Sequence, residues 1–454
     1  MSTTSPNNGR DRRVGGMRAR LSQTVRRRIT TGLWPNRAFV AFWAADSISQ
    51  FGSQISNVAL PLLAALTLGA SPFEMGSLAA AGSAPFLVVA LFAGAWVDRL
   101  PRRPILIAAD LGSFGLLLTI PFAAWRGWLS MEMLYIVAFL TGTLTVCFNV
   151  ARVAYLPALV KREELTDANS KLAATASVAQ VGGPSAAGGM VALVGAPLAI
   201  FLDAVSFLSS AWLIGHIRVE EPRVPARRGK HRIWRETGEG IGVVASHPLL
   251  RALTACSATM NLGGFIFLAV YILYMTGDLG LGPGGVGLVF GLGGVGALAG
   301  ATIAPTAAHW LGVGPTIIWA QLLTGLGGLV IPLAMFAPGI ALPLVLFAEF
   351  FQWMVLVVYD VNALSLRQAV VPDRLRGRVT ATIRFITGGM QPIGALLGGI
   401  LGELIGLRAT LVIGVLMMLA AFLWVAISPL RAIKTIPHHE EARAPEVSLA
   451  PTAS

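Results

Sequence analysis

The 454 residues are 55% hydrophobic and 12% charged, with a mean hydropathy of +0.71, far more apolar than an ordinary soluble domain. This composition excludes disordered, collagen-like and disulfide-scaffold chains, and it would supply about a dozen membrane spans of about 20 residues. The net charge of +12 comes mainly from basic clusters beside apolar runs. Such clusters mark the cytoplasmic side of a membrane protein, so we expect no nucleic-acid partner.

The N-terminal arm, residues 1–37, is polar and Arg-rich and has no long apolar stretch. We therefore expect no cleavable signal peptide, and a disordered cytoplasmic arm attracted to anionic lipid headgroups. The tail, residues 431–454, is also expected to be disordered and cytoplasmic. Its His438 and His439 have no other ligands beside them, so we expect no metal site, and nothing in the chain indicates a cofactor.

Apolar runs bounded by Gly, Pro and charged residues predict an all-α integral membrane protein with twelve transmembrane helices. An even number of spans places both termini on one side. If that side is the cytoplasm, only about two basic residues, Arg126 and Arg408, fall in external loops. The predicted spans are 38–67, 74–97, 104–124, 132–156, 168–194, 197–217, 248–275, 284–308, 315–336, 340–366, 379–403 and 408–430.

The longest internal connection, the cytoplasmic linker 218–247, separates an N-terminal six-helix half (38–217) from a C-terminal half (248–430). Two loop patterns recur in both halves at similar offsets, about 206 and about 210 residues, which indicates a duplicated unit. Repeats of this kind place a substrate site near the membrane midplane and let one half rock against the other.

A stripe of polar residues runs along one face of the first predicted span, at spacings of 0, 3, 4, 7, 8 and 11. Lipid cannot satisfy such a face, so it lines a cavity or contacts neighbouring helices. Shorter polar stripes occur in the seventh, tenth and eleventh predicted spans. For the seventh span, contact between helices explains the stripe as well as a cavity does. The residues predicted to line a substrate cavity are Ser49, Gln50, Ser53, Gln54, Asn57, Asn261, Gln352, Trp353 and Arg384.

Several charged residues are predicted to lie within the membrane. Glu349 is about nine rises of ~1.5 Å from the external end of its span, or about 14 Å deep, and Asp46 reaches a similar level from the opposite face. Loss of water disfavours an ionised carboxylate at that depth, so both are candidates for proton coupling. Arg152 and Asp110 lie nearer the cytoplasmic face, and we expect Arg152 to pair with Asp110 or Asp98.

Several motifs resemble those of the major facilitator superfamily. Residues 94–103 resemble its loop signature G-x-x-x-D-R-x-G-R-R, with Pro101 in place of the glycine, and the run 152–157 and Gly183-Pro184 give further matches. The chain is most similar to the drug-exporter branch that contains macrolide-efflux and siderophore-export proteins of the transmembrane secretion effector type. The gating and motif residues that this resemblance implies are Gly94, Asp98, Arg99, Arg102, Arg103, Asp110, Arg152, Gly183 and Pro184.

The resemblance implies a monomeric twelve-helix transporter of the plasma membrane that works by ion-coupled alternating access. No G-x-x-x-x-G-K-[ST] sequence is present, so an ion gradient is the expected energy source. We expect a secondary exporter of amphipathic organic compounds, such as a drug, antibiotic or siderophore-like product, that exchanges its small-molecule substrate for protons. Uptake of a small metabolite and a scaffold that transports nothing remain open, whereas no residue constellation of an enzyme is visible.

Overall fold

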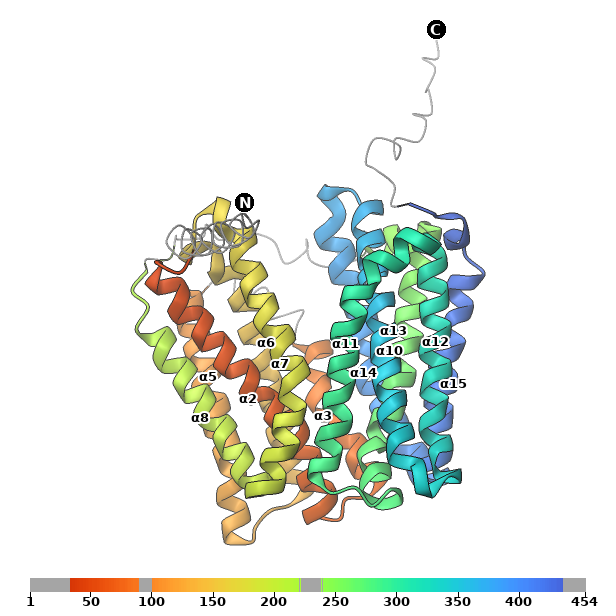
Figure 1. Cartoon of the computed structure of the whole chain (residues 1–454). Helices are drawn as coiled ribbons and strands as arrows, with labels where there is room; N and C mark the ends of the chain where they lie inside the picture. Colours follow the sequence, from red (N-terminus) through yellow and green to blue (C-terminus); the bar gives the residue numbers. More distant parts are fainter. Residues whose placement is uncertain (1–32, 90–99, 220, 222–237, 239, 436–454) are drawn as a thin grey trace, which may run out of the picture.

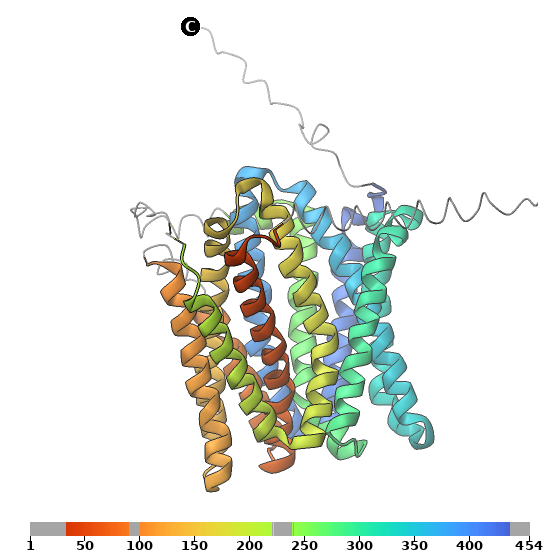
Figure 2. The ribbon, with the colours of Figure 1, turned by 60° about the vertical axis from the view of Figure 1, so that its left-hand side comes forward.

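The computed structural model describes residues 33–89, 100–219, 221, 238 and 240–435, and this part of the chain is built from long α-helices (Figure 1). Figure 2, turned by 60°, shows the same helices running from one end of the molecule to the other. The helices before the linker are α2 (Arg37–Thr67), α3 (Pro72–Val88), α5 (Arg102–Arg126), α6 (Met131–Leu159), α7 (Leu165–Val194) and α8 (Ala196–Gly215). Those after it are α10 (Pro248–Leu273), α11 (Pro283–Leu311), α12 (Val313–Leu333), α13 (Ala341–Val370), α14 (Asp373–Ile405) and α15 (Leu407–Ala426).

Within the described ranges, nine helices are long and apolar enough to cross a membrane. Three helices over predicted spans, α2, α3 and α7, fall outside this set. The polar stripe lowers the hydropathy of α2, the described part of α3 has 17 residues, and α7 opens with polar and charged residues. The helical fold is therefore as predicted, and the count of twelve spans stays a prediction.

The helices on the two sides of the linker have equivalent neighbours. Before the linker, α2 packs against α7 and α8, and α6 packs against α3 and α5. After it, α10 packs against α14 and α15, and α13 packs against α11 and α12. The two sets meet mainly through α3 with α14 and α7 with α11, a pair of contacts that repeats the same symmetry.

One end of the molecule is sealed by close contact between the two sets. A Cβ added at Gly188 of α7 would lie 2.3 Å from Cα of Gly287 in α11, and a Cβ at Gly76 of α3 would lie 2.6 Å from Cα of Gly399 in α14. Only glycine permits backbones to approach so closely. Figure 1 shows α7 and α11 meeting at this end and diverging toward the end where α2 begins.

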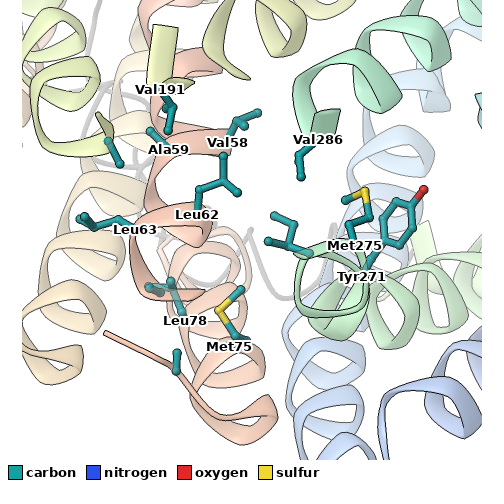
Figure 3. Close-up of a cluster of buried hydrophobic side chains, with 14 of the residues drawn as sticks. Val58, Ala59, Leu62, Leu63, Met75, Leu78, Val191, Tyr271, Met275 and Val286 are labelled. Carbon is teal, nitrogen blue, oxygen red and sulfur yellow. The ribbon is translucent and has the colours of Figure 1, made fainter. Parts of the chain in front are cut away.

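The hydrophobic clusters follow the same division. At the sealed end a single cluster takes residues from both sets, including Leu62 and Met75 from one set and Tyr271 and Val286 from the other (Figure 3). Toward the opposite end, the cluster around Phe42 contains only residues before the linker, and a separate cluster contains only residues after it. As far as the structure describes the chain, the two sets therefore share a hydrophobic core at the sealed end alone.

A polar cavity among α2, α5 and α6

The polar stripe of α2 faces a cavity of about 190 Å³. Every stripe residue except Asn57 borders this cavity, and α5, α6 and α8 complete its wall. Asn57 is exposed and donates to Gln54 Oε1 at 3.4 Å, so it lies beyond the cavity. The complete lining is Asp46, Ser49, Gln50, Ser53, Gln54, Ala109, Asp110, Ser113, Leu144, Thr145, Phe148, Asn149, Arg152 and Phe207.

Asp46 and Arg152 form an ion pair at this cavity. Nη1 of Arg152 lies 3.0 Å from both carboxylate oxygens of Asp46, and Nε2 of Gln50 donates to Oδ2 of Asp46 at 2.6 Å. The Asp46 side chain is 1% exposed and that of Arg152 is 26% exposed. Pairing with a cation and an amide donor is what permits an ionised carboxylate at a buried position.

The prediction that Arg152 pairs with Asp110 was wrong, and Asp98, the other predicted partner, lies outside the described residues. The fold brings α2 and α6 together at the level of Asp46, so the acid from α2 pairs with Nη1 of Arg152, while Nε of Arg152 has no hydrogen-bond partner among the described residues. Asp110 of α5 borders the same cavity with its side chain 1% exposed, and its Oδ2 has no hydrogen-bond partner. The cavity thus holds two carboxylates and one guanidinium.

Glu349, the other predicted coupling residue, occupies a different site in the second set of helices. Its side chain is 3% exposed and accepts hydrogen bonds from the Tyr271 hydroxyl and the Trp353 indole, both at 3.0 Å. Trp353 also packs against Gly293 of α11. Among the described residues no cation pairs with Glu349, so neutral donors alone satisfy it.

The remaining predicted cavity residues of the second set do not converge on one site. Gln352 contacts α12, donating to the Thr324 carbonyl at 3.5 Å. Asn261 donates to the Ser257 carbonyl of its own helix and accepts from Gln391 of α14 at 3.4 Å, which is contact between helices. Arg384 is exposed on α14.

The motif residues near the linker make a compact arrangement. Glu221 accepts from the backbone N–H groups of Arg102 and Arg103 at 2.7 and 2.8 Å, so a linker carboxylate caps the N-terminus of α5. The guanidinium of Arg103 donates to the last carbonyls of α8, those of Ile214 and Gly215. The other predicted loop residues, Gly94, Asp98 and Arg99, lie outside the described residues.

Gly183 and Pro184 of α7 lie at contacts between helices. A Cβ at Gly183 would be 2.5 Å from Cβ of Gln54, so this glycine lets α7 approach the stripe of α2. The carbonyl of Pro184 lies against Gly287 of α11, on the seam between the two sets. Both residues therefore lie at close contacts between α7 and its neighbouring helices.

Sequence reasoning missed one buried acid, Asp203 of α8, whose side chain is fully buried. It accepts from the Ser56 hydroxyl of α2 and from Ser206 at 3.0 Å, and it packs against Gly52. A single aspartate inside the apolar run 197–217 was a sufficient signal, because such a residue is costly in a membrane helix. Ser206 and Ser210 lie on the same helix face at spacings of 3 and 7, so the spacing rule that identified the stripe of α2 also applies to Asp203.

Comparison with known proteins shows that this chain is similar to transporters. Residues 31–452 match the transmembrane secretion effector family. The multidrug efflux pump Tap of Mycolicibacterium fortuitum is 28% identical over 377 residues, which cover 79% of this chain and 88% of that protein. An uncharacterised major facilitator-type transporter, y4rN of Sinorhizobium fredii, is 27% identical over 78% of this chain and 86% of its own.

Solved structures show the same fold at lower identity. An inward-facing structure of a bacterial homologue of the iron transporter ferroportin superposes with a TM-score of 0.70 at 18% identity, covering 86% of this chain and 98% of that chain. The nucleoside transporter NupG gives a TM-score of 0.67 at 9% identity, covering 86% and 99%. These likenesses establish the fold and carry no statement about substrate.

Proposed function

Because the chain belongs to the transmembrane secretion effector family, and is thus a multi-pass membrane protein of the drug-exporter branch of the major facilitator superfamily, we propose that it is a plasma-membrane exporter of amphipathic organic compounds that exchanges substrate for protons. The observation that carries the proposal is the polar cavity on α2, with its paired Asp46 and Arg152. Buried charges at a cavity among apolar helices mark a substrate or ion pathway.

Alternating access is the proposed mechanism. The sealed end, where Gly188 meets Gly287 and Gly76 meets Gly399, supports closure on the external side, and the separate hydrophobic clusters at the other end support an opening toward the cytoplasm. Rocking of one set against the other would break the glycine contacts and close the cytoplasmic end. Twelve spans and cytoplasmic termini belong to this proposal.

Asp46 and Glu349 are the proposed proton carriers. Asp46 is held by Arg152, so its protonation would release the guanidinium and change the charge of the cavity. Glu349 is held only by the neutral donors Tyr271 and Trp353, so it can accept a proton without breaking an ion pair. Burial favours the neutral form of both, as coupling requires.

Proton release from everted membrane vesicles tests the proposal. Vesicles that hold an acidic lumen are given rhodamine 6G, fluorescein or Nile red, which are cationic, anionic and neutral amphipathic dyes. We expect at least one dye to enter the lumen while protons leave it, and vesicles containing Glu349→Gln provide the control. In vesicles preloaded with dye, protein-dependent movement only out of the lumen would indicate uptake into the cell. No protein-dependent movement of any dye in either direction would favour the non-transporting scaffold.

A further inference from the structure

The cavity on α2 carries an unbalanced charge. Its two acids, Asp46 and Asp110, face one cation, Arg152, and that guanidinium is bound by Asp46. The other described residues that line the cavity are uncharged. The carboxylate of Asp110 is therefore left without a cation of its own at the wall of the cavity.

Asp110 is also incompletely hydrogen-bonded. Its side chain is 1% exposed, and although the Ser210 hydroxyl of α8 lies near the carboxylate, Oδ2 has no hydrogen bond of good geometry among the described residues. A buried acceptor without a partner costs about 1–3 kcal/mol, and more when it is charged. Such an atom at a cavity wall is an available acceptor for a ligand that brings a donor or a positive charge.

The rest of the wall fits the organic part of such a ligand. Phe148 of α6 and Phe207 of α8 present aromatic rings, and Leu144 adds an apolar side chain. Aromatic faces attract organic cations as well as apolar groups. The volume of about 190 Å³ is below the ~300–1,000 Å³ of pockets that enclose a whole drug-sized ligand, so the cavity fits the charged end of a larger molecule.

We propose that Asp110 binds the cationic group of an amphipathic organic substrate, with Phe148 and Phe207 contacting the adjoining apolar part. This inference rests on the proposed transport function and specifies its substrate class as organic cations. Asp110 is then a substrate-binding residue, in place of the gating role that the family resemblance implied. While Asp46 is ionised, its pair with Arg152 keeps the guanidinium from neutralising Asp110.

Equilibrium dye binding to the purified full-length protein in uncharged lipid nanodiscs tests this assignment, with empty nanodiscs as the background. Rhodamine 6G and fluorescein share a xanthene body and differ in charge, and fluorescence polarisation reports both. We expect the wild type to bind rhodamine 6G at least tenfold more tightly than fluorescein. Asp110→Asn should raise the Kd for rhodamine 6G about tenfold and leave that for fluorescein within twofold.

Asp203→Asn is the matched control, because Asp203 is an equally buried acid that does not border the cavity. It should change neither Kd by more than twofold. Equal affinity of the wild type for both dyes, or an unchanged Kd for rhodamine 6G in Asp110→Asn, overturns the inference. If Asp110→Asn does not yield folded protein, Asp110→Glu replaces it and should keep the preference for the cationic dye.

Binding is measured without an ion gradient, so its outcome is separate from that of the vesicle assay. Proton-coupled export with no cation preference would refute the role of Asp110 alone. A cation preference that depends on Asp110, without coupled export, would refute the antiport proposal while leaving the binding site in place.

Discussion

Removal of the Arg152 side chain should destabilise the protein because it leaves Asp46 buried without its cation. Breaking a buried ion pair by removing one partner costs about 3–5 kcal/mol. Arg152 is 26% exposed, which places the expected loss at the lower end, about 3 kcal/mol. Asp46→Asn removes the charge from the fully buried member and leaves a guanidinium that can reach water, so its cost should be smaller.

A double-mutant cycle separates this pair from ordinary packing. Arg152→Ala with Asp46→Asn leaves no buried charge at the pair, so the double variant should be more stable than Arg152→Ala alone, with a coupling of about 2 kcal/mol. Arg152→Lys keeps a positive charge but on a different side chain without the planar guanidinium, and it should fall between wild type and Arg152→Ala.

Thermal unfolding of each purified variant, measured in the same detergent and at one scan rate, gives the order of their stabilities. We expect wild type to melt highest, then Arg152→Lys, then the double variant, then Arg152→Ala. A wild-type melting temperature for Arg152→Ala, or a double variant less stable than Arg152→Ala, would refute the reasoning that an uncompensated Asp46 carries the cost.

Three further outcomes are expected. Glu349→Gln should abolish uphill dye export in vesicles while downhill movement survives, since the amide cannot carry a proton; continued accumulation against a gradient would remove Glu349 from the coupling step. Gly188→Leu should separate α7 from Gly287 of α11 and so open the sealed end. In a protein whose native cysteines are replaced and whose Ser185 is changed to cysteine, that cysteine should then react at least several-fold faster with an external impermeant maleimide. An unchanged labelling rate would contradict the seal. Glu221→Gln should lower the thermal stability by about 1 kcal/mol through the weakened cap of α5, and an unchanged melting temperature would show that the cap contributes nothing.

How far the sequence could predict the site depended on distance along the chain. The spacing of the polar residues from Asp46 to Gln54 predicts one helix face, and in the structure this face borders a cavity. That substrate binds there stays a prediction. The partner of Arg152 depended on how α2 and α6 approach each other, which no local pattern specifies, and so the prediction of Asp110 was wrong. Gln352 satisfied the same spacing rule but contacts α12, because a polar face is equally satisfied by a neighbouring helix.

The duplicated scaffold explains why the charged cavity lies on one side of the linker. α10 begins 211 residues after α2 (248 − 37), and the residue 211 positions after Asp46 is Ser257. Arg367 of α13 reaches this serine at 2.6 Å and the Leu253 carbonyl at 3.1 Å, much as Arg152 of α6 reaches Asp46. An arginine on α13 thus contacts α10, as an arginine on α6 contacts α2, but from a position four residues farther along its helix, since the residue 211 positions after Arg152 is Ala363. Its partner on α10 is a hydroxyl and not a carboxylate.

The exchange of aspartate for serine changes what each site can do. Protonation of Asp46 would alter the net charge at Arg152, whereas the serine hydroxyl that Arg367 contacts does not titrate near neutrality. The acid that acts on Arg367 is Asp360, which lies on the same helix, α13, and not on α10. The second set therefore needs a separate acid if it is to respond to protons, and Glu349, bound only by neutral donors, is the buried acid available there. Because the two sets of helices are alike in arrangement but differ in their buried acids, protonation would affect the two halves unequally. It could then favour one relative orientation of the halves over the other, which is what a rocking transporter requires.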